Sequence, residues 1–212
     1  MNAALAGGTG LIGSYLTQFL SEDSDFETVQ FLSRRKVDLA EKYQVINLSE
    51  MSNFTNIDAG FCALGTTMAA AGSKEAFYRI DNNLVLEFSK SCKRSGAKTF
   101  VLVSSVGANS NSSNFYLKVK GEVENAVEEI GFERLVILRP SILLGPRKEH
   151  RLGELIGKKL MCMIDPIMVG PMDKYRGINA ATVARAMINS AEGSGTEIWE
   201  NSAIRKAAGE SY

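Results

Sequence analysis

The feature that most constrains this chain is a glycine-rich turn close to its first residue. The stretch Leu5–Ser14 has the sequence LAGGTGLIGS, in which Gly8, Gly10 and Gly13 match the pattern G-x-G-x-x-G. Gly7 begins the overlapping pattern G-x-x-G-x-x-G. A short apolar run precedes the turn, and apolar residues at three- and four-residue spacing follow it. The glycines therefore lie between a predicted strand and a predicted helix.

A turn of this kind suits a dinucleotide for local physical reasons. One glycine takes the positive φ that a sharp strand-to-helix turn needs, a second lets a pyrophosphate approach the backbone, and a third lets the helix pack on the strand. The helix N-terminus then offers N–H groups to the phosphates. A turn without a ligand is the alternative, and the flanking strand and helix favour the dinucleotide. We predict that the cofactor contacts Gly7, Gly8, Thr9, Gly10, Leu11, Ile12 and Gly13.

The end of the second predicted strand, Thr28–Ser33, indicates which dinucleotide is bound. An NAD site places Asp or Glu about 20 residues after the glycines, on the ribose hydroxyls. This chain has Ser33, Arg34 and Arg35 there, and the first acid beyond them is Asp38. A guanidinium binds a 2′-phosphate that a carboxylate would repel. The sequence predicts NADP(H), with a solvated basic turn as the alternative.

Strand and helix patterns alternate up to about residue 140. Further strand candidates are Tyr43–Leu48, Asp58–Leu64, Phe100–Val103 and Arg134–Arg139, and helical patterns follow Asp81 and cover residues 116–127. Continuous apolar strands are typical of a parallel sheet buried on both faces. The pattern predicts an α/β fold, a Rossmann-type doubly wound parallel sheet. We expect all 212 residues to form one NAD(P)-binding domain, with residues 141–212, including a helix at Asn179–Ala191, as a small substrate-side cap.

Open α/β sheets bind ligands outside the carboxyl ends of their strands. Residues at the other predicted strand ends are therefore further candidates for the cofactor site, two of them beside an adenine ring. These are Asn47 and Leu48 at the adenine, and Ala63, Leu64, Gly65, Thr66 and Pro140.

Composition argues against several other classes of protein. The 24 Lys and Arg balance 24 Asp and Glu, whereas proteins of nucleic acids and membrane surfaces usually carry a basic excess. The odd count of widely spaced cysteines, Cys62, Cys92 and Cys162, indicates reduced thiols, neither a disulfide framework nor a metal site. No basic leader with an apolar core and no apolar run of about 18 residues is present. We expect a cytoplasmic protein.

Tyr116 and Lys120 are candidates for acid–base chemistry. They lie one turn apart on the same predicted helix, downstream of a strand that ends in Ser104 and Ser105. A phenol is a poor base at neutral pH unless a nearby cation stabilises its phenolate. The alternative is a packing tyrosine, a solvated lysine and serines that cap a strand.

Taken together, these elements resemble the short-chain dehydrogenase/reductase superfamily. The resemblance rests on GGTGLIG, the serine pair after the fifth strand, YLKVK, and RPSILLGP at residues 139–146. The stretches NFYLKVKGEVE at 114–124 and LRPSILLGPRKEHRLGE at 138–154 are similar to the Tat-interacting-protein-like branch of its atypical or extended members.

The resemblance implies a role for each candidate side chain. Tyr116 would be the general acid/base, and Lys120 would stabilise its phenolate and hydrogen-bond the nicotinamide ribose. Ser105, with Ser104 as the alternative, would hold the substrate oxygen. The chain departs from the family at Asp81, where many members have Asn, so a proton relay from Lys120 is in question. The segment after Pro140 is shorter than in sugar-nucleotide epimerases, which disfavours a bulky nucleotide-sugar substrate.

These inferences predict an NADP(H)-dependent oxidoreductase that transfers a hydride between nicotinamide and a small carbonyl or alcohol. The alternative is an NADPH-binding sensor with little catalysis that regulates a partner protein. A homodimer or a protein partner is compatible with either function. Arg147 and Arg151 follow the sixth strand, where they would contact an anionic or polar substrate group or form a solvated loop.

The two arginines after the second strand allow a first test. We predict that Arg34→Ala and Arg35→Ala weaken NADPH binding roughly tenfold or more, because each charge-assisted hydrogen bond contributes about 1.5–3 kcal/mol. NADH lacks the 2′-phosphate and serves as the matched control, so its affinity should stay unchanged. Calorimetric titration with both cofactors is the measurement. Unaltered NADPH affinity in both variants would remove the case for a 2′-phosphate site.

Overall fold

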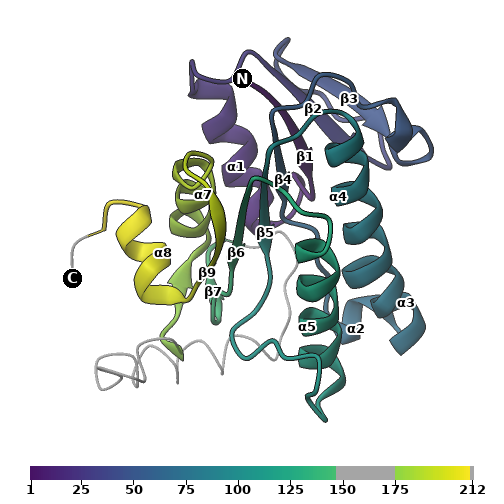
Figure 1. Cartoon of the computed structure of the whole chain (residues 1–212), viewed down its shortest axis with the longest axis vertical. Helices are drawn as coiled ribbons and strands as arrows, with labels where there is room; N and C mark the ends of the chain where they lie inside the picture. Colours follow the sequence, from purple (N-terminus) through teal and green to yellow (C-terminus); the bar gives the residue numbers. More distant parts are fainter. Residues whose placement is uncertain (147–174, 211–212) are drawn as a thin grey trace.

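The chain folds around one large parallel sheet (Figure 1). The computed structural model describes residues 1–146 and 175–210. Within these residues the sheet has seven strands in the order β3-β2-β1-β4-β5-β6-β9. Its strands are β1 (Asn2–Ala6), β2 (Thr28–Ser33), β3 (Tyr43–Asn47), β4 (Ala59–Cys62), β5 (Thr99–Val103), β6 (Arg134–Leu138) and β9 (Gly195–Trp199). All the pairings are parallel, which confirms the predicted Rossmann-type α/β fold.

Helices cover both faces of the sheet, so the molecule has three layers (Figure 1). One face carries α1 (Leu11–Glu22), α7 (Ala180–Asn189) and α8 (Asn201–Ala207). The other carries the 3₁₀ turn η1 (Leu48–Asn53), α4 (Val85–Arg94) and α5 (Phe115–Glu128). A hydrophobic core lies on each face of the sheet, and successive strand residues point into opposite cores. Leu5 packs in the core with α1, and its neighbour Ala6 packs in the core with α4. No described helix has the length and apolarity to cross a bilayer.

Short elements complete the described part of the chain. Between β4 and α4 lie α2 (Met68–Ala71), α3 (Lys74–Tyr78) and the π-helical turn η2 (Arg79–Leu84). A separate parallel ribbon pairs β7 (Leu143–Leu144) with β8 (Ile178–Asn179).

The structure differs from the predicted alternation and from the predicted cap. No α-helix separates β2 from β3, and the connection from β3 to β4 contains only the turn η1. Residues 141–212 do not act solely as a cap, because β9 pairs with β6 and α7 packs against α1. The sequence did not predict β9, because this edge strand contains the polar, exposed residues Thr196 and Glu197 and so lacks a continuous apolar pattern.

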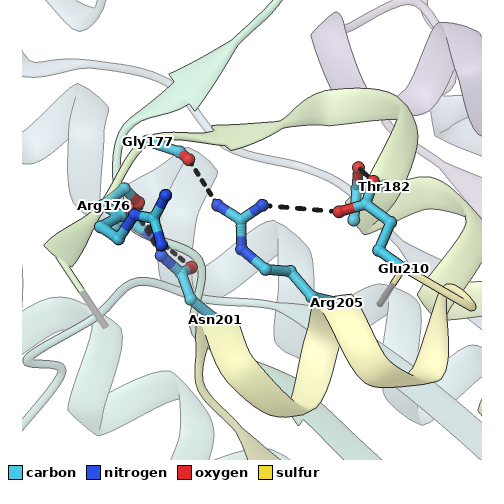
Figure 2. Close-up of polar contacts among 7 residues, drawn as sticks. Arg176, Gly177, Thr182, Asn201, Arg205 and Glu210 are labelled. Atoms are coloured by element: carbon cyan, nitrogen blue, oxygen red, sulfur yellow. Dashed lines mark hydrogen bonds and ion pairs between the residues drawn. The ribbon is translucent and has the colours of Figure 1, made fainter. Parts of the chain in front are cut away.

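Polar contacts hold the C-terminal helix α8 beside β8 (Figure 2). The Arg205 guanidinium donates to the Gly177 carbonyl at 2.7 Å and lies 3.4 Å from the Glu210 carboxylate. The buried Asn201 side chain donates to the Arg176 carbonyl at 2.6 Å. The chain that follows residues 147–174 is therefore fastened to α8 by hydrogen bonds to the Arg176 and Gly177 carbonyls.

Close packing where α1 meets the glycine turn yields a stability prediction. A Cβ on Gly13 would lie 2.0 Å from the Gly7 carbonyl oxygen, a backbone atom that cannot swing aside. We expect Gly13→Ala to lower the free energy of unfolding by about 1–3 kcal/mol, as overpacking usually does. The exposed neighbour Ser14 supplies the control, because Ser14→Ala should change the free energy of unfolding by no more than about 0.5 kcal/mol. Urea denaturation of both variants measures this, and equal stabilities would contradict the packing argument.

Candidate cofactor and acid–base site

The predicted site residues gather where the strand order reverses. The chain runs from β1 to β2 and β3 on one side, and from β4 through β5 and β6 to β9 on the other. The connections that leave the carboxyl ends of β1 and β4 run to opposite sides of the sheet, and α/β sheets bind ligands outside such a switch point. The two strand ends are held together where the Ala63 N–H donates to the Ala6 carbonyl at 2.9 Å.

The glycine turn fits tightly between β4 and α1. Gly7 has a φ of 83°, and a Cβ there would lie 2.4 Å from the Ala63 carbonyl carbon. The turn closes with a hydrogen bond of 2.9 Å from the Gly10 N–H to the Gly7 carbonyl. Side chains at Gly7 or Gly13 would push the turn away from the sheet, so the sequence pattern is explained by backbone packing.

The N-terminus of α1 is suited to an anion. Gly10 occupies the N-cap position, no described side chain caps the helix, and its first turn contains no acid. Thr9 and Gly10 are exposed. Helix N-terminal N–H groups without a side-chain partner, together with the positive end of the helix dipole, favour a phosphate. This part of the site fits the pyrophosphate of a dinucleotide.

The residues predicted to contact the adenosine half lie at the same edge of the sheet. Register places Ser33 beside Asn47, and Arg34 and Arg35 follow as exposed side chains. The Asn47 carboxamide oxygen accepts from the Ser49 N–H at 3.1 Å and caps η1, which begins at Leu48. Their contacts with a cofactor stay predictions.

A buried ion pair lies on the other side of the switch point. The Lys120 Nζ on α5 is 2.7 Å from Asp81 Oδ1 on η2, and the two side chains are 6% and 0% exposed. Asp81 Oδ2 accepts from the Thr66 N–H at 2.8 Å, in the loop after β4. A Cβ on Gly65 would lie 3.4 Å from Asp81 Oδ1. The loop predicted to contact the cofactor, which also contains Leu64, is thus connected to α5 through Asp81.

Tyr116 lies in the first turn of α5, one turn before Lys120. The Asn114 side chain caps this helix by accepting from the Leu117 N–H at 3.2 Å. The half-buried Tyr116 ring packs against Phe77, with 5.6 Å between ring centroids. Burial lowers the pKa of Lys120, but the opposing charges of Asp81 and Tyr116 outweigh it, so the pKa lies above its ordinary value.

The two serines follow β5 at the same edge. Ser105 is half-buried and its hydroxyl donates to the Val106 carbonyl at 3.4 Å, whereas the buried Ser104 hydroxyl has no partner among the described residues. In residues 1–146 and 175–210 no hydrogen bond joins Ser105 to Tyr116 or Lys120. Pro140, after β6, accepts from the Val106 N–H at 3.0 Å and so lies beside the serines.

Sequence reasoning did not foresee two residues that shape this arrangement. Asp81 stands out in the sequence as a departure from a family pattern, and an acid within the apolar pattern of a helix indicates a buried partner, but the sequence does not identify Lys120 as that partner. A Cβ on Gly121 would lie 2.1 Å from the Ser110 nitrogen, so this glycine lets the loop after β5 pack on α5. Arg147 and Arg151 lie outside the described residues.

A cavity of about 370 Å³ lies elsewhere, between α1 and α7. Its lining includes Tyr15, Gly145, Thr182, Arg185 and Glu210. None of the predicted catalytic residues lines it, so the geometry of the switch point, and not this cavity, defines the candidate site.

Cys62 is the last residue of β4, near the ion pair of Lys120 and Asp81, and its side chain is a neutral thiol. Burial raises its pKa to about 12, against smaller opposing effects of the Leu64 backbone and the Lys120 charge. Cys92 is also buried, and burial raises its pKa well above the ordinary value. Neither of these two cysteines is suited to act as a nucleophile, because only a thiolate is a good sulfur nucleophile.

The fold is that of a Rossmann-type α/β protein, and the candidate site lies at the switch point of its parallel sheet. Its overall fold is similar to that of the human epimerase family protein SDR39U1, solved with NADPH, with a TM-score of 0.67 and 18% identity over 94% of this chain and 74% of that one. At this identity the likeness shows the fold alone.

Sequence comparison is more specific. The HIM1 family model matches residues 25–169, and the chain belongs to that family, in its atypical HTATIP2-like branch. It is 36% identical to the rat protein HTATIP2 over 94% of this chain and 86% of the rat protein. It is 41% identical to the mitochondrial protein FMP52 of Debaryomyces hansenii over 71% of this chain and 70% of that protein.

The names of the fungal relatives contradict the expected cytoplasmic location. FMP52 is named as a mitochondrial protein in Debaryomyces hansenii and in other fungi. The expectation rested on balanced charge, on reduced thiols and on the sequence criteria for secretion and membrane insertion. It was wrong because none of these distinguishes a cytoplasmic from a mitochondrial protein.

Thiol labelling tests the described environment of Cys62. At pH 8.5 an ordinary cysteine is about half ionised, so the thiolate fraction of Cys62 should be roughly a thousandfold smaller. We expect iodoacetamide to leave Cys62 unmodified in the folded protein and to label it in guanidinium chloride, as read by mass spectrometry of its peptide. Equal labelling rates in the two conditions would show that Cys62 is exposed and ionised.

Proposed function

We propose that this protein is an NADP(H)-dependent oxidoreductase that interconverts a small carbonyl compound and its alcohol. The observation that carries the proposal is the buried Lys120, paired with Asp81 at 2.7 Å and one helical turn from Tyr116, beside the switch point of a dinucleotide-type fold. A phenol next to a buried ammonium group is the arrangement that acid–base catalysis on a carbonyl oxygen requires.

The residues of the crevice fit a nicotinamide dinucleotide in two respects. The close approach of Gly7 to β4 and the uncapped N-terminus of α1 leave backbone N–H groups for a pyrophosphate. Arg34 and Arg35 are exposed at the end of β2, where they would bind a 2′-phosphate. The cofactor would supply or accept the hydride when bound.

The protein side chains would handle the proton and position the substrate. Tyr116 would donate a proton to the carbonyl oxygen or take one from the alcohol. Ser105 would hold the same oxygen through its hydroxyl, which makes only a long hydrogen bond of 3.4 Å within the chain. Lys120 would hydrogen-bond the nicotinamide ribose with donors that Asp81 does not occupy, since an ammonium group has three.

The solved SDR39U1 contains NADPH, which is in keeping with a nicotinamide cofactor for this chain. The main rival is a sensor that binds NADPH and controls a partner protein without turnover. The two functions share the cofactor crevice and differ in whether Tyr116 takes part in chemistry.

Removing the Tyr116 hydroxyl distinguishes the enzyme from the sensor. We expect Tyr116→Phe to lower kcat by about 10²–10⁴, the usual contribution of a positioned acid or base. The ring keeps its contact with Phe77, so folding and NADPH affinity should hold. Lys120→Met should weaken cofactor binding and turnover together. The measurements are kcat on a carbonyl found by following NADPH absorbance across a panel, and the cofactor Kd of each variant.

A Tyr116→Phe protein with wild-type kcat would contradict the catalytic assignment. Tight NADPH binding without turnover of any carbonyl would instead favour the sensor.

A further inference from the structure

The carboxylate of Asp81 is placed by an irregular helical turn. Asp81 lies in η2, a π-helical segment between α3 and α4, and it is fully buried. Single π-helical turns inside longer helices occur frequently at functional sites. Here the turn directs one side chain toward both the loop after β4 and helix α5.

Both partners of this carboxylate among the described residues are hydrogen-bond donors. Asp81 Oδ2 accepts from the Thr66 N–H at 2.8 Å, and Oδ1 lies 2.7 Å from the Lys120 ammonium. A carboxylate accepts at both oxygens, whereas an asparagine amide would face one donor with its own NH₂ group. The position therefore calls for an ionised acid.

Lys120 needs such a partner because it is buried. An ammonium group deep in a protein loses its hydration and becomes neutral unless an anion compensates. In the part of the chain that the structure describes, the titratable groups that face it are Asp81 from η2, Tyr116 from α5 itself and Cys62 from β4. Cys62 is a neutral thiol and Tyr116 is a phenol, so Asp81 is the permanent anion among them.

We propose that Asp81 is a positioning residue that keeps Lys120 protonated and directed at Tyr116 and the cofactor crevice. Asp81 acts through Lys120 and touches neither substrate nor reacting atoms. The proposal concerns the charge of Lys120 and extends the proposed function, on which its catalytic consequence rests. Without this carboxylate, Lys120 would lose its proton at a lower pH and with it the ability to stabilise a phenolate.

A direct measurement needs neither cofactor nor turnover. The protein is labelled with lysine carrying ¹³C at Cε, and the Lys120 resonance is assigned by its loss in Lys120→Met. In the wild type this resonance should titrate above the ordinary range of a lysine side chain. In Asp81→Asn its midpoint should fall by at least about 1 pH unit. A wild-type midpoint below the ordinary lysine range would overturn the proposal even if Asp81→Asn does not fold.

Glu124 provides a matched control on the same helix. It is buried four residues after Lys120 and forms an ion pair with Arg139 at 2.5 Å. Glu124→Gln removes a buried carboxylate near Lys120 without touching Asp81, so the Lys120 midpoint should move far less than in Asp81→Asn. Equal shifts in both variants would show a general effect of lost charge and contradict a specific role of Asp81.

The pH profile of kcat/KM separates this proposal from the proposed function. If both hold, the alkaline loss of activity moves to lower pH in Asp81→Asn by the same amount as the Lys120 resonance. A shifted resonance with an unmoved activity profile would leave Asp81 as the group that charges Lys120 but refute the assigned catalytic role of Lys120. An unmoved resonance would refute the role of Asp81 itself.

Discussion

The close approach of backbone to backbone at the glycine turn is the constraint on which the site depends. Gly7 lies against the Ala63 carbonyl, and Gly13 packs α1 against Gly7. This contact fixes the direction in which α1 leaves the sheet and brings its uncapped N-terminus to the carboxyl ends of β1 and β4. Only glycine meets the packing that this arrangement requires at Gly7 and Gly13.

Asp81 connects this region to helix α5. It accepts from the Thr66 N–H in the loop after β4 and pairs with Lys120 on α5, so the loop and the helix that carries the proposed acid–base pair are held by one buried side chain. Removing one member of such a pair leaves an uncompensated buried charge, which is why buried ion pairs are costly to break. The arrangement gives the site a fixed charge and a fixed geometry before any ligand binds.

Much of the fold was predictable because local patterns and tertiary structure agree. The strand predicted at Thr28–Ser33 forms with those bounds, and α1 follows the glycine turn as expected. Strand β9 was not predictable, since an edge strand buries too little to show a continuous apolar pattern. Its pairing with β6 depends on a contact between distant segments, and it changes a predicted cap into part of the sheet.

The candidate site was predictable in part for the same reason. Tyr116 and Lys120 share a helix face, and their spacing is visible in the sequence. Asp81 lies far from Lys120 along the chain, and nothing local shows that it would be buried beside it. The packing of the loop after β5 on Gly121 is likewise a contact between two backbones that no spacing rule reveals.

The central claim is that the crevice beside the glycine turn places a nicotinamide next to Tyr116. A crystal structure of the protein grown with NADP⁺ tests it most directly. The account predicts the pyrophosphate on the N–H groups of the turn, the 2′-phosphate at Arg34 or Arg35, and the nicotinamide ring beside the Tyr116 hydroxyl, with Lys120 on the adjoining ribose. A cofactor bound elsewhere, or with its nicotinamide directed away from Tyr116, would contradict it.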